Sequence, residues 1–265
     1  MRTGGMFREA AITSEGLRVG FRTNSGDLLA KISSVFVPDS APIDFTKLDF
    51  IYSLKELRRD SYSAYHGSRV LLQRASLTAA LDSIDCDLQH TIAKHSRDHL
   101  FLHAGVLGWR QRAILFPGRT CTGKSTLINA LIRAGAVYFS DEFARIDARG
   151  WVHPFCRPLS LRTPRGKLTV HPEQEGLQIA DGPYRIGAIV ATHYSAGRAW
   201  CPTRLSPGQA ALELLSNAVA VRSDPIKAVE YVGKLVSSAR AISSPRGEAE
   251  ATVPVLFETL ERLLD

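Results

Sequence analysis

Hydrophobic residues follow two different patterns along the chain, and the pattern changes near residue 98. Up to about residue 75, short runs of β-branched and aromatic residues are separated by turn-forming residues, which is typical of β-strands. Three of these predicted strands are residues 28–36, 49–54 and 69–74. A helix is predicted from Ser76 to about His95, because apolar residues recur there at helical spacing. We therefore expect a small N-terminal α+β lobe over residues 1–98.

After residue 98, predicted strands alternate with predicted helices. Apolar strands at 100–107 and 112–116 surround a polar turn, and the second strand leads into a glycine-containing segment that opens a helix. The remaining predicted elements are a strand at 136–140, a hairpin at 143–155, a loop over about 157–167, strands at 184–191 and 200–205, and helices at 207–221, 224–240 and 248–264. This order predicts an α/β core over residues 99–265.

The segment between the second strand and its helix matches the GxxxxGK[ST] pattern of a phosphate-binding loop. Its glycines let the backbone curl so that N–H groups surround a phosphate, and the following helix adds the positive end of its dipole. Lys124 can reach the β- and γ-phosphates of a nucleotide, and the Ser125 hydroxyl can bind Mg²⁺. The predicted nucleotide-binding residues are Gly118, Arg119, Thr120, Cys121, Thr122, Gly123, Lys124, Ser125 and Thr126.

An acidic pair, Asp141 and Glu142, follows the next predicted strand. Hard cations prefer carboxylate oxygens, so we expect Asp141 to bind Mg²⁺ together with Ser125, directly or through water. Glu142 is then available to accept a proton from an attacking group. Adjacent carboxylates beside a phosphate site also raise one of the two pKa values, and which of them is the base stays open.

His103 lies on the predicted strand before the phosphate loop, flanked by apolar residues. A histidine in such a position is more often a hydrogen-bonded core residue than a catalytic group. Folding nevertheless places this strand next to the one that feeds the loop, so a catalytic role for His103 is the second interpretation.

Several motifs together resemble the core of the HPr kinase/phosphorylase family. They are His103-Ala104-Gly105, the loop 118–126, Arg133-Ala134-Gly135, Ser140-Asp141-Glu142, residues 151–160 and residues 205–209. The resemblance covers roughly residues 100–265 and, more faintly, the N-terminal part. It implies a P-loop kinase core similar to that of phosphoenolpyruvate carboxykinase, ATP and Mg²⁺ as cofactors, and His103 as an assisting residue beside the acidic pair. It also implies phosphoryl transfer to a hydroxyl, such as a serine, of a protein, peptide or small molecule.

The chain departs from that family pattern at three positions. Glu142 stands in place of an aspartate, Cys121 in place of a loop glycine, and Gln209 in place of an arginine. The last difference leaves phosphorylase activity and the identity of the acceptor open.

Basic residues gather after the predicted hairpin, at Arg157, Arg162, Arg165 and Lys167. Arginines beside a nucleotide site can stabilise charge on a transferred phosphoryl group, so Arg157 and Arg162 are candidate substrate contacts. Solvated surface charge is an equally good explanation of each.

Composition narrows the class of protein further. A net charge of +7 without a Lys/Arg run does not indicate nucleic-acid binding, and no apolar stretch is long enough to predict a membrane span. The absence of a signal-like N-terminus and four scattered cysteines favour a cytoplasmic protein without a disulfide framework. Related kinases assemble into rings, so a homo-oligomer is possible.

Three other functions fit parts of the pattern. A transport-type ATPase lacks a second strand ending in Asp-Glu here, and a GTPase switch lacks an Asn-Lys-x-Asp motif. An ATPase or nucleotide-binding scaffold without a dedicated acceptor remains the alternative to a kinase.

Overall fold

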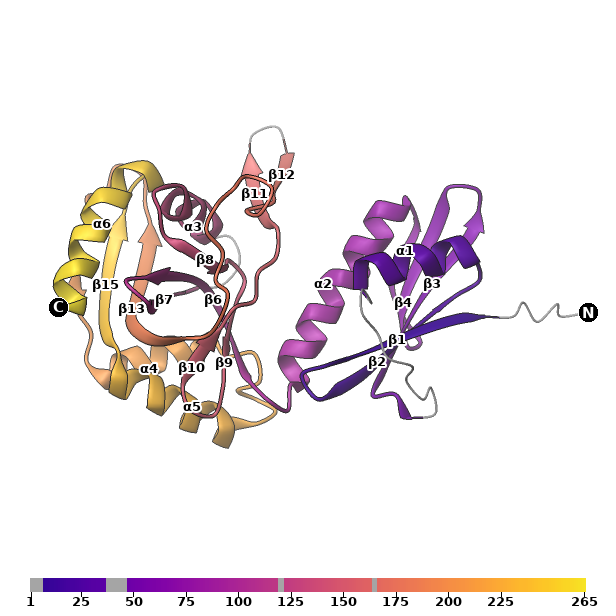
Figure 1. The fold of residues 1–265 in the computed structure, drawn as a ribbon, viewed down its shortest axis with the longest axis horizontal. Coiled ribbons are helices and arrows are strands. Elements are labelled where there is room, and N and C mark those ends of the chain that lie inside the picture. Colours follow the sequence, from indigo (N-terminus) through magenta and orange to yellow (C-terminus); the bar gives the residue numbers. More distant parts are fainter. Residues whose placement is uncertain (1–6, 37–46, 119–121, 164–165) are drawn as a thin grey trace, which may run out of the picture. The chain divides into compact units, whose positions relative to one another are not determined.

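The chain forms two compact units, Met1–Asp98 and His99–Asp265, here called the N-terminal and C-terminal units. The structure, a computed structural model, describes residues 7–36, 47–118, 122–163 and 166–265. Both units combine helices with strands, which confirms the expected mixed α/β class (Figure 1). In the described part of the chain, no helix combines the length and apolar character needed to cross a bilayer.

The N-terminal unit is built on a five-stranded sheet in the order β1-β2-β3-β4-β5. Its strands are β1 (Arg8–Ser14), β2 (Leu17–Thr23), β3 (Phe50–Arg58), β4 (Ser61–His66) and β5 (Arg69–Ala75). Only β2 and β3 pair in parallel among these neighbours. Helix α1 (Gly26–Phe36) packs against β1 and β2, and α2 (Leu77–His95) packs against β4 and β5.

Residues 28–36 form most of helix α1, so the prediction of a strand there was wrong. The buried residues Leu28, Ile32 and Phe36 recur every four positions and place one helical face on the sheet. The Phe36 ring stacks on Phe21 of β2, with ring centroids 5.3 Å apart. This spacing outweighs the β-branched content of the segment.

Helix α2 begins where it was predicted. The Ser76 hydroxyl accepts a hydrogen bond from the Ala79 N–H at 3.3 Å and caps the first turn. The predicted strands at 49–54 and 69–74 are confirmed as parts of β3 and β5.

The C-terminal unit is built on an eight-stranded sheet in the order β10-β9-β6-β7-β13-β15-β14, with β8 paired to β6. The strands are β6 (Leu100–Trp109), β7 (Arg112–Pro117), β8 (Val137–Ser140), β9 (Phe143–Ile146), β10 (Trp151–His153), β13 (Tyr184–Tyr194), β14 (Thr203–Arg204) and β15 (Arg240–Arg246). Strands β7, β13 and β15 run parallel to one another. Their carboxyl ends therefore meet at one edge of the sheet.

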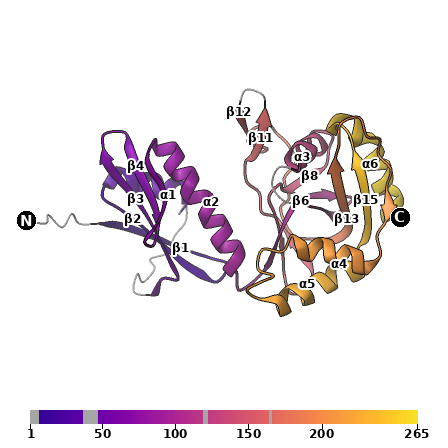
Figure 2. The ribbon, with the colours of Figure 1, turned by 180° about the vertical axis from the view of Figure 1, so that it is seen from behind.

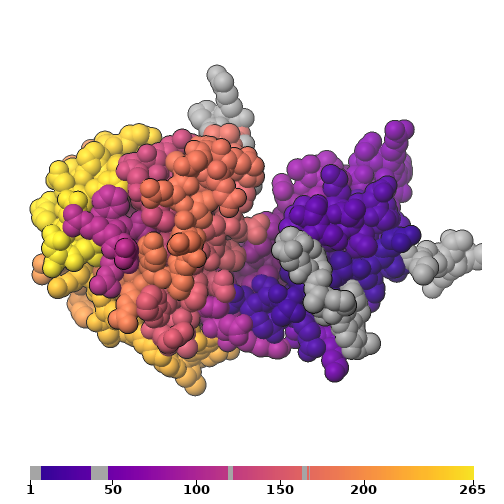
Figure 3. Space-filling view, in the orientation of Figure 1, coloured from indigo at the N-terminus to yellow at the C-terminus, as the bar shows by residue number. Residues whose placement is uncertain are grey.

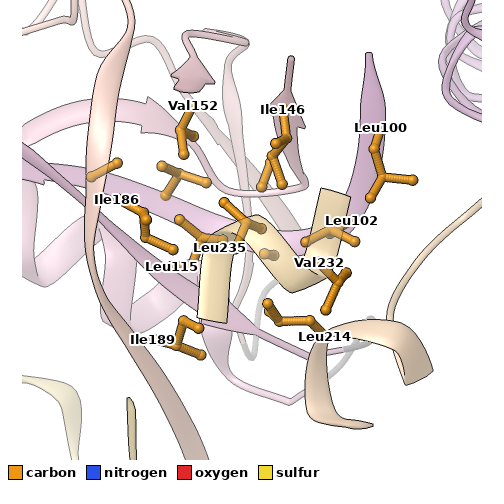
Figure 4. Close-up of a cluster of buried hydrophobic side chains, with 14 of the residues drawn as sticks. Leu100, Leu102, Leu115, Ile146, Val152, Ile186, Ile189, Leu214, Val232 and Leu235 are labelled. Atoms are coloured by element: carbon orange, nitrogen blue, oxygen red, sulfur yellow. The ribbon is translucent and has the colours of Figure 1, made fainter. Parts of the chain in front are cut away.

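Helices cover both faces of this sheet, as Figure 1 and Figure 2 show from opposite sides. The helices are α3 (Lys124–Arg133), α4 (Pro207–Ser216), α5 (Pro225–Ser238) and α6 (Ala249–Leu264). Helices α4 and α5 pack on one face through Leu214, Val232 and Leu235 (Figure 4), whereas α3 and α6 pack on the other. In the space-filling view, α6 forms part of the surface of the C-terminal unit (Figure 3).

The side chains of the central strand β7 contribute to the hydrophobic cores on both faces of the sheet. Leu115 belongs to the core beneath α4 and α5, while Ile114 and Phe116 belong to the core beneath α3 and α6. Successive strand side chains point to opposite faces, so a continuous apolar run fills both cores.

Three predictions in this unit need correction, and one strand was not predicted. The expected loop over 157–167 overlaps β11 (Leu159–Thr163) and the start of β12 (Gly166–Val170), which pair antiparallel, and buried Leu159 holds β11 in the core beneath α3 and α6. The expected strand at 200–205 shrinks to β14, and the helix at 207–221 ends at Ser216. Strand β15 was not predicted, since its serines and Pro245 give little local strand signal and pairing with β13 forms it.

Candidate functional site

The phosphate loop leaves the end of β7 at the carboxyl edge of the parallel strands. The Gly118 N–H donates to the His103 carbonyl of neighbouring β6 at 3.1 Å, which holds the start of the loop against the sheet. Helix α3 begins at Lys124, preceded by Gly123 at φ +76°, a left-handed conformation that favours glycine. The predicted loop residues Arg119, Thr120 and Cys121 lie outside the described residues.

The first turn of α3 has the character of an anion site. It contains Lys124 and Ser125 but no acidic residue, and Thr126 is exposed at the same turn. Leu127, Ile128 and Leu131 are buried and fix the helix on the sheet. The positive end of the helix dipole is thus held rigidly at the loop.

Lys124 spans the loop from its end to its beginning. Its Nζ donates to the Gly118 carbonyl at 2.6 Å. Burial lowers the pKa of this ammonium group, while the charges of Asp141 and Glu142 act in the opposite direction. Both acidic residues therefore lie within electrostatic reach of the loop lysine.

Asp141 follows β8 and meets the start of α3. Burial raises the pKa of its carboxyl group, against the effects of a hydrogen bond from Ser125 and the charge of Lys124. The Tyr138 hydroxyl lies 3.3 Å from Asp141 Oδ1. Ser125 and Asp141, the two expected Mg²⁺ ligands, are brought together; a hydroxyl and a carboxylate suit this hard cation.

Glu142 and His103 lie at the same edge through their backbones. The Glu142 carbonyl accepts a hydrogen bond from the Ala104 N–H at 3.2 Å, and its own N–H donates to the Ser140 hydroxyl at 3.2 Å. The His103 ring is half-buried and tilts against the ring of Phe143, with centroids 4.8 Å apart. His103, Glu142 and the loop start are thus neighbours on adjoining strands.

The two candidate substrate arginines lie in different surroundings. The Tyr138 hydroxyl lies 2.8 Å from the Arg157 carbonyl, which places the Arg157 backbone near Asp141. Arg162 is exposed on β11, and among the described residues no hydrogen bond or ion pair joins it to the loop.

The Thr122 side chain of the phosphate loop is exposed and faces Gly118. A Cβ added at Gly118 would lie 3.2 Å from the Thr122 Oγ1.

Two residues at the site were not found from the sequence. Tyr138 joins Asp141 to Arg157, and its place on the strand leading to Asp141 was the available signal. Arg246, at the end of β15, donates from Nη2 to the Gly123 carbonyl at 2.8 Å. Nothing in the local sequence around Arg246 indicates this contact, because it joins residues 123 positions apart.

The described arrangement is suited to holding a polyphosphate and a divalent cation. It combines a helix N-terminus, a half-buried lysine, a hydroxyl that acts on a half-buried carboxyl group, and a second carboxylate with a histidine nearby. These groups are the parts that in-line phosphoryl transfer requires: charge neutralisation, positioning and a proton acceptor.

Comparison with solved structures gives a distant similarity. No family model matches the chain, and no curated protein matches it. A solved structure of the Hpr(Ser) kinase/phosphatase from Coxiella burnetii is similar to the chain, with 15% sequence identity and a TM-score of 0.35. The alignment covers 61% of this chain and 93% of that one.

Proposed function

We propose that this protein is an ATP- and Mg²⁺-dependent phosphotransferase of the HPr-kinase-like type, which transfers the γ-phosphate to a hydroxyl group. The acceptor class is a hydroxyl, such as that of serine, on a protein, peptide or small molecule. One observation carries the proposal: Ser125, at the start of α3, and the charge of Lys124 both act on the half-buried Asp141 carboxyl group and lower its pKa, against the effect of burial. A structural glycine turn before a helix does not require this half-buried carboxyl group.

Binding of the nucleotide follows from the loop and helix α3. The N–H groups at the start of α3 and the Lys124 ammonium neutralise phosphate oxygens, and Lys124 would exchange its contact with the Gly118 carbonyl for a phosphate. Ser125 and Asp141 would hold Mg²⁺, which supplies further charge neutralisation for the β- and γ-phosphates. The charge of Mg²⁺ would also offset the burial that raises the pKa of Asp141.

Proton transfer is assigned to the acidic pair. Glu142 is available as the base if Asp141 holds the cation, and Asp141 takes that part if it does not. His103, whose carbonyl fixes the start of the loop, lies beside Glu142 and would assist by hydrogen bonding at the reacting groups. We propose these roles on the basis of their common position at one edge of the sheet.

The test follows labelled γ-phosphate from Mg-ATP in the presence of serine-containing peptides, an HPr-like protein and free serine. Wild-type protein should label one acceptor, and Lys124→Ala should reduce transfer by about a hundredfold or more, because it removes the positive side chain aimed at the phosphates. Glu142→Gln should reduce transfer by about a hundredfold while retaining ATP binding.

Matched controls are Lys94→Ala and Glu258→Gln, since both residues are exposed and lie outside the site. Both should leave transfer unchanged. Wild-type transfer in Lys124→Ala would contradict the assignment of the loop. Release of label only as free phosphate would favour an ATPase, and ATP binding without turnover would favour a scaffold.

A further inference from the structure

Arg246 is an arginine buried at the edge of the sheet where the phosphate loop starts. Only 1% of its surface is exposed, and it is among the largest fully buried side chains of the described chain. It ends β15, which runs parallel to β13, as does β7. Arg246 and the loop that leaves β7 therefore belong to the same carboxyl edge, where ligands of parallel sheets bind.

The guanidinium group is held by the phosphate loop itself. Nη2 donates to the Gly123 carbonyl at 2.8 Å, and Nη1 donates to the Gly247 carbonyl at 3.1 Å. The ring of Tyr194 lies under the group at 5.4 Å from its centroid. Nε is buried and has no hydrogen-bond partner among the described residues. Arg246 thus fixes the last glycine before α3.

Its positive charge is not balanced by an ion pair within the described part of the chain. Glu248 attracts it from a distance, but the Glu248 carboxylate accepts a hydrogen bond from the Tyr194 hydroxyl at 2.7 Å. A buried charge without a close counter-charge is destabilising unless a ligand supplies one. The nearest ligand position that suits an anion is the phosphate loop.

Gly123 and Arg246 are sterically matched to each other. A Cβ added at Gly123 would lie 2.8 Å from Arg246 Nη2, closer than carbon and nitrogen atoms normally approach. The loop backbone at Gly123 can therefore rest directly on the guanidinium group only because residue 123 is a glycine.

We infer that Arg246 is a positioning residue of the nucleotide site: it orients the loop through the Gly123 carbonyl, and its buried charge is compensated by the bound polyphosphate. This inference rests on the proposed function. Arg246 acts through Gly123 and contributes its charge from behind the loop, whereas Lys124 acts from inside it. The ligand-free protein then carries a destabilising charge that nucleotide binding relieves.

The test compares Arg246→Met with the wild type in thermal unfolding and in calorimetric titration with Mg-ATP. Without ligand, Arg246→Met should unfold at or above the wild-type temperature, because methionine fills the space without a buried charge. Its affinity for Mg-ATP should fall by about tenfold to a hundredfold, the usual effect of losing a hydrogen bond to a charged group. The rise in unfolding temperature caused by Mg-ATP should shrink accordingly.

If Arg246 had only a structural role, the changes in unfolding temperature and in affinity would both be the opposite of those expected here. If Arg246→Met unfolds several degrees lower without ligand and binds Mg-ATP as the wild type does, the inference is wrong. Arg246→Lys keeps the positive charge but loses the two guanidinium nitrogens that contact both carbonyls, so its affinity for Mg-ATP should lie between those of Arg246→Met and the wild type. The same variant can be compared with the wild type if Arg246→Met does not fold. Exposed Arg222→Met is the matched control and should change neither quantity. Wild-type protein that does not bind Mg-ATP would instead contradict the proposed function.

Discussion

Tyr138 and Ser125 both interact with the Asp141 carboxyl group. The Tyr138 hydroxyl lies between the Asp141 carboxylate and the Arg157 carbonyl, and Ser125 lowers the pKa of the same carboxyl group. Burial raises the pKa values of both Tyr138 and Asp141. The Asp141 carboxylate is therefore held in a place that disfavours its charge unless a cation is nearby.

At this scale we predict that Asp141→Asn stabilises the ligand-free protein while weakening Mg-ATP binding. An acid whose pKa is raised on folding binds its proton more tightly in the native state. Its contribution to stability is therefore lost as pH rises from the ordinary value of 3.8 through the raised value. Asparagine removes this loss, so the unfolding temperature of Asp141→Asn should exceed that of the wild type near neutral pH.

Thermal unfolding measured at a series of pH values checks the prediction, with exposed Asp181→Asn as the control. The gap between Asp141→Asn and wild type should widen as pH rises through the titration of Asp141. A gap that is constant with pH, or a less stable variant at neutral pH, would show that burial does not dominate at Asp141.

Strand β6 and helix α3 pack unusually closely, and this contact sets the position of Lys124. A Cβ added at Gly105 of β6 would lie 2.7 Å from Ile128 Cδ1 and 3.2 Å from Lys124 Cγ. Gly105 was noted from the sequence only as part of the His103-Ala104-Gly105 motif. A side chain at residue 105 would therefore overlap with Ile128 unless α3 moved.

At the element scale, Gly105→Ala should therefore shift α3 away from β6 and weaken Mg-ATP binding. Overpacking of this kind destabilises proteins by about 1–3 kcal/mol. Adding Ile128→Ala removes both Cδ1 and Cγ1, each of which would lie 2.7 Å from the added Cβ, and should recover part of the affinity. Urea unfolding and ATP titration measure the two effects, and Gly182→Ala, which has open space around it, is the control. Failure of Ile128→Ala to recover any affinity would argue against this steric account.

Nucleotide binding should stabilise the two units to different extents. Both buried clusters beneath the helices of the C-terminal unit, and all described residues of the candidate site, come from residues after Asp98. The N-terminal unit has its own buried residues, among them Phe21, Tyr52 and Leu54. Ligand binding stabilises the part of a protein that forms the site.

For the whole molecule we predict that calorimetry of the full chain resolves two unfolding transitions, of which Mg-ATP raises only one. At a concentration of one hundred times the dissociation constant, the added stability should be about 2.7 kcal/mol. Leu54→Ala should lower the other transition and so identify it as the N-terminal unit. A single transition that moves as a whole with Mg-ATP would show instead that the units unfold together.

Local patterns in the sequence account for the elements that contain the loop. The apolar strand, the glycine-lysine-serine run and the helix of buried leucines and isoleucines are neighbours in the chain, so β7 and α3 were predicted near their observed bounds. The strand before Asp141 and the capped helix α2 were predicted for the same reason. Each depends on periodicity or capping within a few residues.

Three-dimensional packing accounts for the rest. Residues 28–36 are helical because the face formed by Leu28, Ile32 and Phe36 is buried on a sheet. Strand β15 forms because it pairs in parallel with β13. The contact of Arg246 with Gly123 joins chain positions that no local pattern connects. Contacts of this kind form only when distant segments are brought together, so the loop was evident in the sequence, whereas the residue that supports it emerged from the fold.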